Sequence, residues 1–343
     1  MIGGAATRAE RRGFPRSGRT LLSVGAGASL FLVGFLAPPH VASEFVLRLA
    51  AEGLLLGMLA LSVAFLMSQA GLVALGAASL YGGVGYLFAV GLSQWDLSPI
   101  AATGFAFAVA ILYAAGLGAL IIRTNPLAFM MLTLAAGEMI SHGVTLEGLR
   151  DYTSGADGLV VTFKGALLGY GAADFASPIR FWPVCWTVAC LAGVAALVLR
   201  KSRLGAILRA IRENEERMRF SGFDTYWPRL VAYVFVNMIA ALAGLLHVLS
   251  AGFVSPESLG LSVSTNALVA ALVGGVAGSI GPLAGGLIYA FAQDEFGARG
   301  LTRLLTGLAI VVFIVLLPRG VVGGLVDSIR HWGRSAARPG QVR

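Results

Sequence analysis

Hydrophobic residues run along this chain in segments of roughly twenty, separated by short stretches rich in polar residues, glycine and proline. A helix of about twenty residues crosses the ~30 Å hydrocarbon core of a bilayer. Backbone groups in lipid must pair within their own segment, which favours helices. The pattern therefore predicts an all-α, polytopic integral membrane helical bundle. About ten transmembrane segments are expected, at residues 20–37, 45–67, 72–92, 99–122, 125–144, 179–200, 229–251, 264–277, 281–296 and 302–317.

Two of these segments are weaker than the others. Residues 264–277 and 281–296 are each short for a full crossing, and the sequence Gly-Ser-Ile-Gly-Pro at 278–282 interrupts them. They are expected either to cross the membrane twice or to form a broken, re-entrant pair inside the bundle. The 46 glycines of the chain favour close helix packing, because small residues let transmembrane helices approach one another.

The positive charges follow the expected membrane topology. Residues 1–19, Arg123, 200–229 and 318–343 hold 19 of the 25 lysines and arginines, and all these segments fall on one side. The positive-inside rule places them, and with them both termini, in the cytoplasm. The sequence thus predicts a basic cytoplasmic N-terminus (1–19), a multi-pass domain in the cell (inner or plasma) membrane (20–317) and a basic cytoplasmic tail (318–343).

Motifs of soluble enzymes and metal proteins are absent from the sequence. Neither lysine, Lys164 or Lys201, lies in a phosphate-binding G-x-x-x-x-G-K-[ST] loop. The four histidines have no cysteine or carboxylate neighbours at metal-ligand spacing. Since the basic residues form no face, the formal charge of +8 does not indicate nucleic-acid binding. We expect no enzymatic activity, no cofactor and no metal site in this chain.

A dense charged segment at 203–222 interrupts the apolar pattern within the cytoplasmic loop 200–229. Its apolar residues recur every three or four positions, which predicts an amphipathic helix. Glu213–Arg217 and Glu215–Arg219 have the spacing of helical ion pairs. Asn214 alternatively caps a second short helix. We expect this element to dock a soluble partner; the alternative is a solvated connection that carries positive-inside charge.

Five ordered stretches resemble the permeases of branched-chain amino acid ABC importers, specifically the LivM-type subunit. Residues 205–217, Gly-Ala-Ile-Leu-Arg-Ala-Ile-Arg-Glu-Asn-Glu-Glu-Arg, followed by Gly222, resemble the cytoplasmic coupling signature of that family. The other stretches are A-G-L…L-G at 70–76 with Gly82 and Tyr86, M-L-T-L-A-A-G-E at 131–138, T-S-G-A-D-G-L at 153–159, and G-G…G-S-I-G-P at 274–282. The resemblance covers about residues 45–317.

The resemblance implies an ABC importer permease fold and a transmembrane subunit that imports a small solute, either an amino acid or a related amide or carboxylate. It implies as partners two ABC ATPase subunits, a second, LivH-like permease and an extracytoplasmic substrate-binding protein, besides the lipid bilayer. ATP hydrolysis is expected on the ATPases. Their docking is expected on Gly205, Arg209, Ala210, Ile211, Arg212, Glu213, Asn214, Glu215, Glu216, Arg217 and Gly222.

The chain departs from the family at several polar positions. Ala74 and Ala77 stand where the family has Ser and His, and Ala64 and Gln69 stand where it has Asn and Tyr. These losses indicate a more apolar or differently polar pathway, and a substrate other than leucine, isoleucine or valine. The alternative is that those family residues only brace helices.

Polar residues inside the spans are candidates for the substrate pathway. They are Gln69, Thr133, Glu138, His142 and Asn266. A purely structural Glu138–His142 pair is an equal alternative, and Asn266 is alternatively the N-cap of its short segment. Arg48 and Glu52, four residues apart, are expected to pair structurally.

The loop at 145–178 is expected to face outward, toward the binding protein. Its residues Thr153, Gly155, Asp157 and Gly158 predict a tight turn whose backbone groups Asp157 and the glycines satisfy. Two other classes remain as alternatives. A secondary transporter driven by an ion gradient requires repeats and midplane ion ligands, and neither is evident. An integral-membrane enzyme requires clustered histidines and acidic residues, which are missing.

Overall fold

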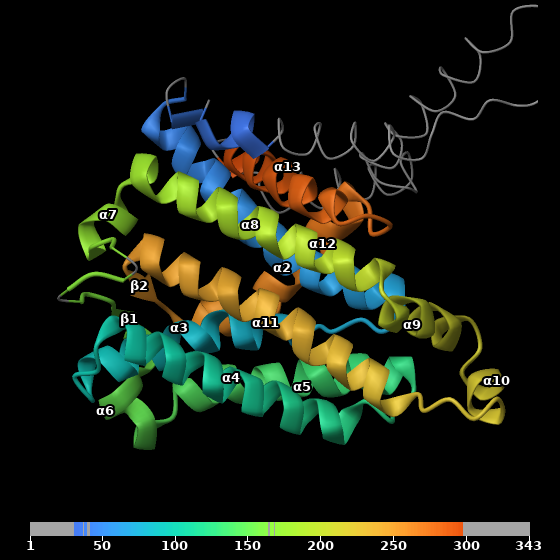
Figure 1. The fold of residues 1–343 in the computed structure, drawn as a ribbon. Helices are drawn as coiled ribbons and strands as arrows, with labels where there is room; N and C mark the ends of the chain where they lie inside the picture. The colour runs from blue at the N-terminus through green and yellow to red at the C-terminus, as the bar shows by residue number, and fades with distance from the viewer. Residues whose placement is uncertain (1–30, 37, 40–41, 164, 168, 298–343) are drawn as a thin grey trace, which may run out of the picture.

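The structure, a computed structural model, describes residues 31–36, 38–39, 42–163, 165–167 and 169–297 (Figure 1). Its longer helices are α2 (Glu44–Ala70), α3 (Ala77–Ser93), α4 (Pro99–Ile121), α5 (Pro126–Val144), α8 (Pro178–Lys201), α11 (Tyr226–Ala251), α12 (Leu261–Gly274) and α13 (Ile280–Gly297). These helices overlap eight of the ten expected segments. The segment 302–317 and both basic termini lie outside the described residues, as does most of 20–37.

Among the described residues, five helices are long and apolar enough to cross a membrane: α2, α4, α5, α8 and α11. α3 and α12 are apolar but shorter. The chain is therefore a helical, polytopic bundle, as its hydrophobic pattern predicts.

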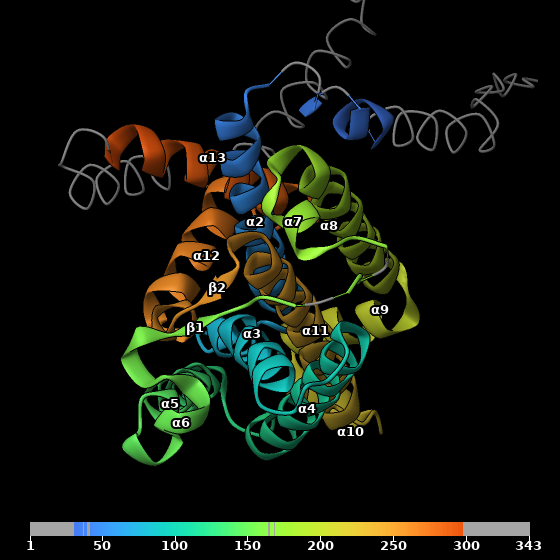
Figure 2. The ribbon, with the colours of Figure 1, turned by 90° about the vertical axis from the view of Figure 1, so that its left-hand side faces the viewer.

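α2 lies at the centre of the bundle and packs against α8, α11, α12 and α13 (Figure 2). In its most apolar stretch 78% of the residues are buried, compared with 28% for α4 and 17% for α5. α2 is thus the core helix, whereas α4, α5 and α8 each turn a broad face outward. Large side chains exposed on these faces are Leu112, Leu120, Met131, Met139, Leu191 and Val198.

Small residues set the helix contacts. A side chain on Gly57 of α2 would lie 2.8 Å from the carbonyl oxygen of Leu283, and Gly286 of α13 packs directly on the α2 backbone. On α4, Ala102, Ala106, Ala110 and Ala114 recur at every fourth position and are completely buried. These close approaches supply the van der Waals contact that holds helices together in lipid.

The interrupted segment is a helical hairpin. α12 ends at Gly274, Gly275 turns the chain with φ of 101°, and α13 starts at Ile280. With 14 residues α12 is about 21 Å long, too short to cross a ~30 Å core unaided. Its N-cap is Gly260, so the expectation that Asn266 caps this helix is wrong: the helix begins five residues earlier, at Leu261, and Asn266 lies within it.

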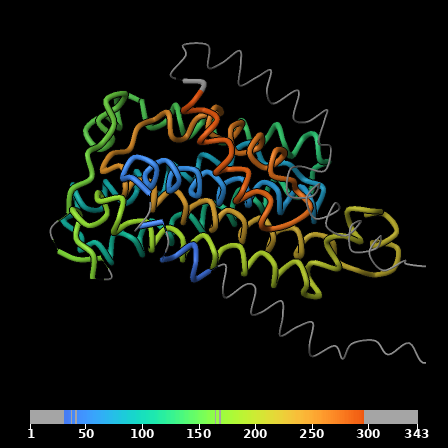
Figure 3. The backbone as a smooth tube through the Cα atoms, turned by 90° about the horizontal axis from the view of Figure 1, so that it is seen from above, coloured from blue at the N-terminus to red at the C-terminus, as the bar shows by residue number. Residues whose placement is uncertain are grey.

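The two ends of the bundle differ. One end carries η1 (Glu147–Leu149), α6 (Arg150–Thr153), η2 (Gly155–Asp157), α7 (Ala172–Ala176), η3 (Pro256–Leu259) and the antiparallel strands β1 (Leu159–Val160) and β2 (Phe253–Val254). The opposite end carries α9 (Arg203–Glu213) and α10 (Glu215–Phe220). Figure 3 shows this second connection, in yellow, projecting beyond the ends of the long helices.

Candidate functional site

Two helices, not one, form the connection between α8 and α11. The Ser202 hydroxyl accepts a hydrogen bond from the Gly205 N–H and caps α9. The Asn214 side chain accepts from the Arg217 N–H at 2.8 Å and caps α10. Gly222, with φ of 81°, follows the last turn of α10. The alternative that Asn214 starts a second helix is therefore the one observed.

The apolar stripe of α9 faces the bundle. Leu208 and Ile211 are 0% and 1% exposed. A side chain on Gly205 would overlap the carbonyl oxygen of Arg200 and lie 2.6 Å from that of Leu199. Because glycine is the only residue without a Cβ, it lets the first turn of α9 pack against the last turn of α8.

Two arginines of α9 and one of α8 bind the C-terminus of α2. Arg212 Nη1 donates to the Ser68 carbonyl at 2.6 Å, Arg209 Nη1 to Gln69 Oε1 at 2.8 Å, and Arg200 Nη2 to Ser68 Oγ at 2.9 Å. α2 has no basic residue in its own last turn. The arginines therefore supply the positive charge that stabilises a helix C-terminus.

The sequence identified Gln69, Arg209 and Arg212 in this cluster but not Ser68 or Arg200. Ser68 and Arg200 could have been found from the sequence, because α2 ends in polar residues without a basic side chain and an arginine-rich loop follows α8. Gln69 is 1% exposed and bonds to α9. Gln69 was a candidate for the substrate pathway, but in the structure its side chain binds α9.

Glu215 connects α10 to the start of α11. Its carboxylate accepts from Arg219 Nη2 at 2.9 Å and from Arg229 Nη2 at 2.8 Å. The Arg229 side chain is only 7% exposed, so Glu215 neutralises a buried charge. The expected Glu215–Arg219 pair is thus confirmed, whereas Glu213 and Arg217 form no ion pair with each other.

A second set of side chains points away from the bundle. Phe220 is 91% exposed, Trp227 is 60% exposed and Phe223 is 52% exposed. The charged or polar residues Glu213, Asn214, Glu216 and Arg217 are exposed as well. We call Glu213, Asn214, Glu216, Arg217 and Phe220 the outer face of the α9–α10 connection.

A hollow of about 480 Å³ adjoins this outer face and is lined by Arg123, Arg219, Phe223, Asp224, Thr225, Tyr226 and Trp227. The Arg123 guanidinium lies 4.8 Å from the centre of the Tyr226 ring, a cation–π contact that fixes one wall. Aromatic and arginine side chains beside a hollow are the kind that anchor protein partners.

Three of the other pathway candidates make contacts that involve α12 or α5. Glu138 Oε1 accepts from the Leu261 N–H at 3.1 Å, so this carboxylate sits at the N-terminus of α12. His142, 82% exposed, lies 3.7 Å from the other Glu138 oxygen, which confirms the pair. Asn266 Oδ1 accepts from the Tyr289 hydroxyl at 2.8 Å and joins α12 to α13.

Thr133 lies on the buried side of α5. Its hydroxyl donates to the Met130 carbonyl at 2.9 Å, and its carbonyl packs directly on Gly76 at the start of α3. The positions that distinguish this chain from the resembling family are buried too: Ala64, Ala74 and Ala77 are 0%, 5% and 3% exposed. These alanines are part of the helix packing.

The T-S-G-A-D-G-L turn satisfies its backbone through Thr153. This hydroxyl shares its one proton between the carbonyls of Val144 and Leu149, at 2.7 and 2.9 Å, and accepts from the Gly155 N–H. The sequence assigned that role to Asp157, which is exposed. Gly158, with φ of 72°, leads into β1, and a side chain there would overlap the Val254 carbonyl oxygen of β2.

Further along the same connection, Asp174 fixes α7. The Gly171 N–H and the Arg180 guanidinium both donate to its carboxylate and hold the pKa of Asp174 below its usual range. α7 is thereby tied to the first turn of α8.

Comparison with known proteins identifies the family. Residues 45–317 match the family described as branched-chain amino acid transport system / permease component. The chain is 26% identical to the high-affinity branched-chain amino acid transport system permease protein LivM of Escherichia coli K12, over 85% of this chain and 74% of LivM.

Two other relatives come from the same organism. The permease protein LivH is 27% identical over 65% of this chain and 75% of its own. The ribose import permease protein RbsC is 25% identical over 52% and 56%. No solved structure matches significantly. The chain therefore belongs to the branched-chain amino acid transport system permease family.

Proposed function

We propose that this chain is the transmembrane permease subunit of an ATP-driven ABC importer for a small solute. Partner ATPases dock on the outer face of α9–α10, at Glu213, Asn214, Glu216, Arg217 and Phe220. ATP is hydrolysed on those partners, and the chain itself performs no bond chemistry. The observation that carries the proposal is the division of α9–α10 into residues bound to α2 and residues exposed beyond the bundle.

This division refines the docking set proposed from sequence. Gly205, Arg209, Ile211, Arg212 and Glu215 hold the connection to the bundle. We therefore assign them to transmission of the movement, and the exposed residues to contact with the ATPase. Ala210, half-buried between the two sets, and Gly222, which ends α10, position the connection.

The faces of the bundle follow from this assignment. The end with α9 and α10 faces the cytoplasm, in agreement with the basic residues there. The end with β1, β2 and α7 faces outward and receives the solute from an extracytoplasmic substrate-binding protein. A second, LivH-like permease covers one of the open apolar faces of α4, α5 and α8, and lipid covers the others.

The proposed solute is an amino acid or a related amide or carboxylate. Relatives carry the names of branched-chain amino acid and ribose permeases, so the family's solutes are small and polar. The buried alanines Ala64, Ala74 and Ala77 support a solute other than leucine, isoleucine or valine, because they offer no hydrogen bond where the resembling family has polar side chains.

The test is purification of the full-length chain with its ATPase subunits, followed by reconstitution with the binding protein. We expect ATP-dependent uptake, and we expect Glu216→Lys with Arg217→Glu to abolish ATPase co-purification. Glu147→Lys with Arg150→Glu, at the opposite end, is the matched control. Uptake that follows an ion gradient without ATP, or ATPase binding that survives the Glu216 and Arg217 changes, contradicts the proposal.

A further inference from the structure

A cavity of about 360 Å³ opens at the outward end of the bundle, away from every pathway residue discussed above. Three elements form it: the first turns of α2, the junction of α7 and α8, and the last turns of α11. Its lining residues are Glu44, Phe45, Arg48, Ala51, Glu52, Phe175, Ala176, Pro178, Phe181, His247, Ser250 and Ala251. This volume falls in the range of small-molecule sites.

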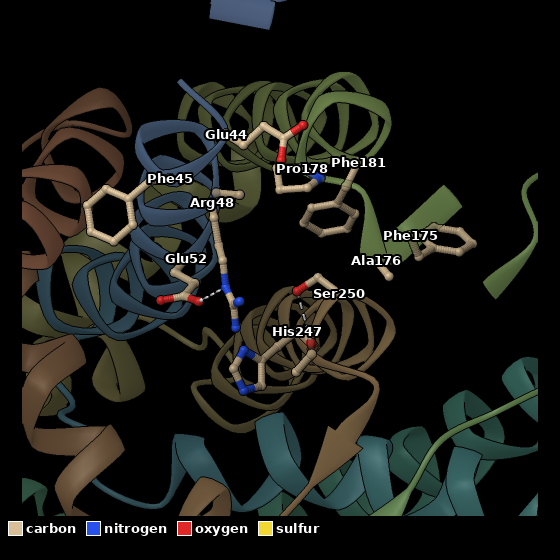
Figure 4. Close-up of a pocket in the computed structure, with 12 residues that line it drawn as sticks. Glu44, Phe45, Arg48, Glu52, Phe175, Ala176, Pro178, Phe181, His247 and Ser250 are labelled. Carbon is tan, nitrogen blue, oxygen red and sulfur yellow. Dashed lines mark hydrogen bonds and ion pairs between the residues drawn. The ribbon is translucent and has the colours of Figure 1, made fainter. Parts of the chain in front are cut away.

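The charged residues of the cavity lie on one stripe of α2. Glu44, Arg48 and Glu52 are four residues apart, so all three project from the same face of the helix. Arg48 Nε donates to Glu52 Oε1 at 3.3 Å, and Figure 4 shows the guanidinium reaching between α2 and α11 toward His247 and Ser250.

The Arg48–Glu52 ion pair leaves the terminal nitrogens of Arg48 and the carboxylate of Glu44 able to bind a ligand. A guanidinium has five N–H donors, and Glu52 engages only the one on Nε. The two terminal nitrogens of Arg48 bond to no other described residue. Glu44 likewise forms no hydrogen bond or ion pair within the described part of the chain. With respect to the described residues, the cavity therefore offers a guanidinium fork and a carboxylate that are not engaged.

Apolar surface lies beside these charges. Phe175 and Phe181 are 4% and 2% exposed, and their ring centres are 6.4 Å apart. These two rings are buried, and the apolar surface that the cavity exposes comes from Ala176 and Pro178, at the junction of α7 and α8. A ligand that fits these features has an anion, a cation and a small apolar group close together.

We propose that this cavity binds a zwitterionic α-amino acid on the outward side of the permease. The carboxylate of the amino acid accepts from the terminal nitrogens of Arg48, as planar guanidinium groups favour. Its ammonium group donates to Glu44, and its side chain packs on the accessible apolar surface of Ala176 and Pro178. Glu44 and Arg48 lie one helical turn apart, so both can reach groups on a single α-carbon.

This inference names the solute class and the first binding station of the proposed function, on which it rests. It also explains why α2 carries an ion pair, Arg48–Glu52, at an exposed position. An ion pair as exposed as Arg48–Glu52, with 70% and 47% of the two side chains accessible, contributes little to stability. Binding of solute is a function that such an accessible pair can serve.

The experiment measures binding to the purified full-length chain in lipid nanodiscs, without ATPase, ATP or binding protein. The probes are alanine, leucine and phenylalanine. Two analogues of leucine test the charges: 4-methylpentanoate lacks the ammonium group, and 3-methylbutylamine lacks the carboxylate. We expect saturable binding of at least one of the three amino acids, and neither analogue should compete with the amino acid that binds.

Variants then locate the site. Arg48→Gln and Glu44→Gln are each expected to weaken binding by about tenfold or more, because each removes one charged hydrogen-bond partner. Arg48→Lys, which keeps the charge but loses the fork, should lie between Arg48→Gln and the unaltered chain. Arg150→Gln and Glu147→Gln, on the same end but outside the cavity, should leave affinity unchanged. Thermal unfolding of each variant establishes that it is folded.

Three results would overturn the inference. One is that none of the three amino acids binds. Another is that they bind with affinity indifferent to Arg48 and Glu44. The third is that the variants change only the phosphatidylethanolamine that co-purifies, which would assign the cavity to a lipid headgroup. ATPase co-purification is measured on the same preparations, so a permease that binds its ATPase but no amino acid retains the proposed function and loses only this site.

Discussion

Arg209 of α9 donates a hydrogen bond to the side-chain oxygen of Gln69, the penultimate residue of α2, at 2.8 Å. The same guanidinium nitrogen also reaches the Arg200 carbonyl at 2.8 Å. One side chain of the α9–α10 connection thus touches both the core helix of the bundle and the end of α8.

From this contact we expect Gln69→Leu to separate ATPase binding from transport. Leucine fills the buried position but accepts no hydrogen bond, at a cost of ~1 kcal/mol. The ATPase should still co-purify, because the outer face is intact, while ATP-driven uptake falls by about fivefold or more. Gln94→Leu is the matched control, since Gln94 donates to the Asp151 carbonyl at the opposite end. Loss of ATPase binding in Gln69→Leu would contradict the assignment.

Phe220→Ser should have the reverse effect. A phenylalanine 91% exposed contributes almost nothing to packing within this chain. An aromatic anchor at an interface, however, contributes ~2 kcal/mol or more to binding. We expect unchanged thermal unfolding but loss of ATPase co-purification. Val160→Ser, 70% exposed on the opposite end, serves for comparison. A Phe220→Ser chain that retains its ATPase would remove this residue from the docking face.

Gly205→Ala should disturb α9 without touching its charges. The added methyl group overlaps the Arg200 carbonyl, so α9 must move away from α8, at a cost of ~1–3 kcal/mol. The expected result is a lower temperature of thermal unfolding and slower uptake. Gly116→Ala on α4 is the control, because its methyl group meets no atom within 4 Å. Equal stability of the two variants would show that the close approach of α8 and α9 is dispensable.

Substitutions at Glu138 distinguish its two roles. Glu138→Gln keeps an acceptor for the Leu261 N–H, so a residue that only positions α12 should tolerate it with near-normal uptake. Glu138→Ala removes the acceptor and should cost ~1 kcal/mol, as loss of an N-terminal cap does. Uptake abolished in a folded Glu138→Gln protein would instead place this carboxylate on the solute path.

Cysteine labelling tests the orientation of the bundle. In a background without Cys185 and Cys190, cysteines at positions 157 and 201 are exposed to a membrane-impermeant thiol reagent in intact cells. We expect labelling of position 157 on the outward turn and protection of position 201 at the end of α8. Labelling of position 201 alone would invert the model of topology.

The helices were predictable because each follows from a run of apolar residues of membrane length. The start of α12 was not, because Leu261 to Val263 lie before the predicted segment 264–277. The Glu138 carboxylate that accepts from the Leu261 N–H comes from α5, 123 residues away. A partner that distant in sequence leaves no local signal. The same reason explains why Asn266 was mistaken for a cap.

The sequence predicted helical structure at 203–222, where α9 and α10 lie, but it did not separate the residues that bind the bundle from those that are exposed. The spacing of apolar residues predicts that Leu208 and Ile211 lie on one face of the helix. It does not predict which of the neighbouring charged side chains contact the bundle. Arg209 and Arg212 do so because the C-terminus of α2 ends beside them without a basic residue of its own. The cavity at Arg48 was hidden for a similar reason, since its apolar wall comes from α7 and α8.

The single-residue junction at Ser202 makes the α9–α10 connection a rigid extension of α8 rather than a flexible linker. Only Ser202 separates the end of α8 from the start of α9, and Gly205 lets the first turn of α9 pack closely against the end of α8. A displacement of α9 therefore pulls on α8 through the chain and on α2 through the arginines at the same instant. The cavity at Arg48 is lined by the first turns of both α2 and α8, at the ends far from α9. Under the proposed function, a movement of α9 would therefore change the shape of the cavity on the opposite side of the membrane.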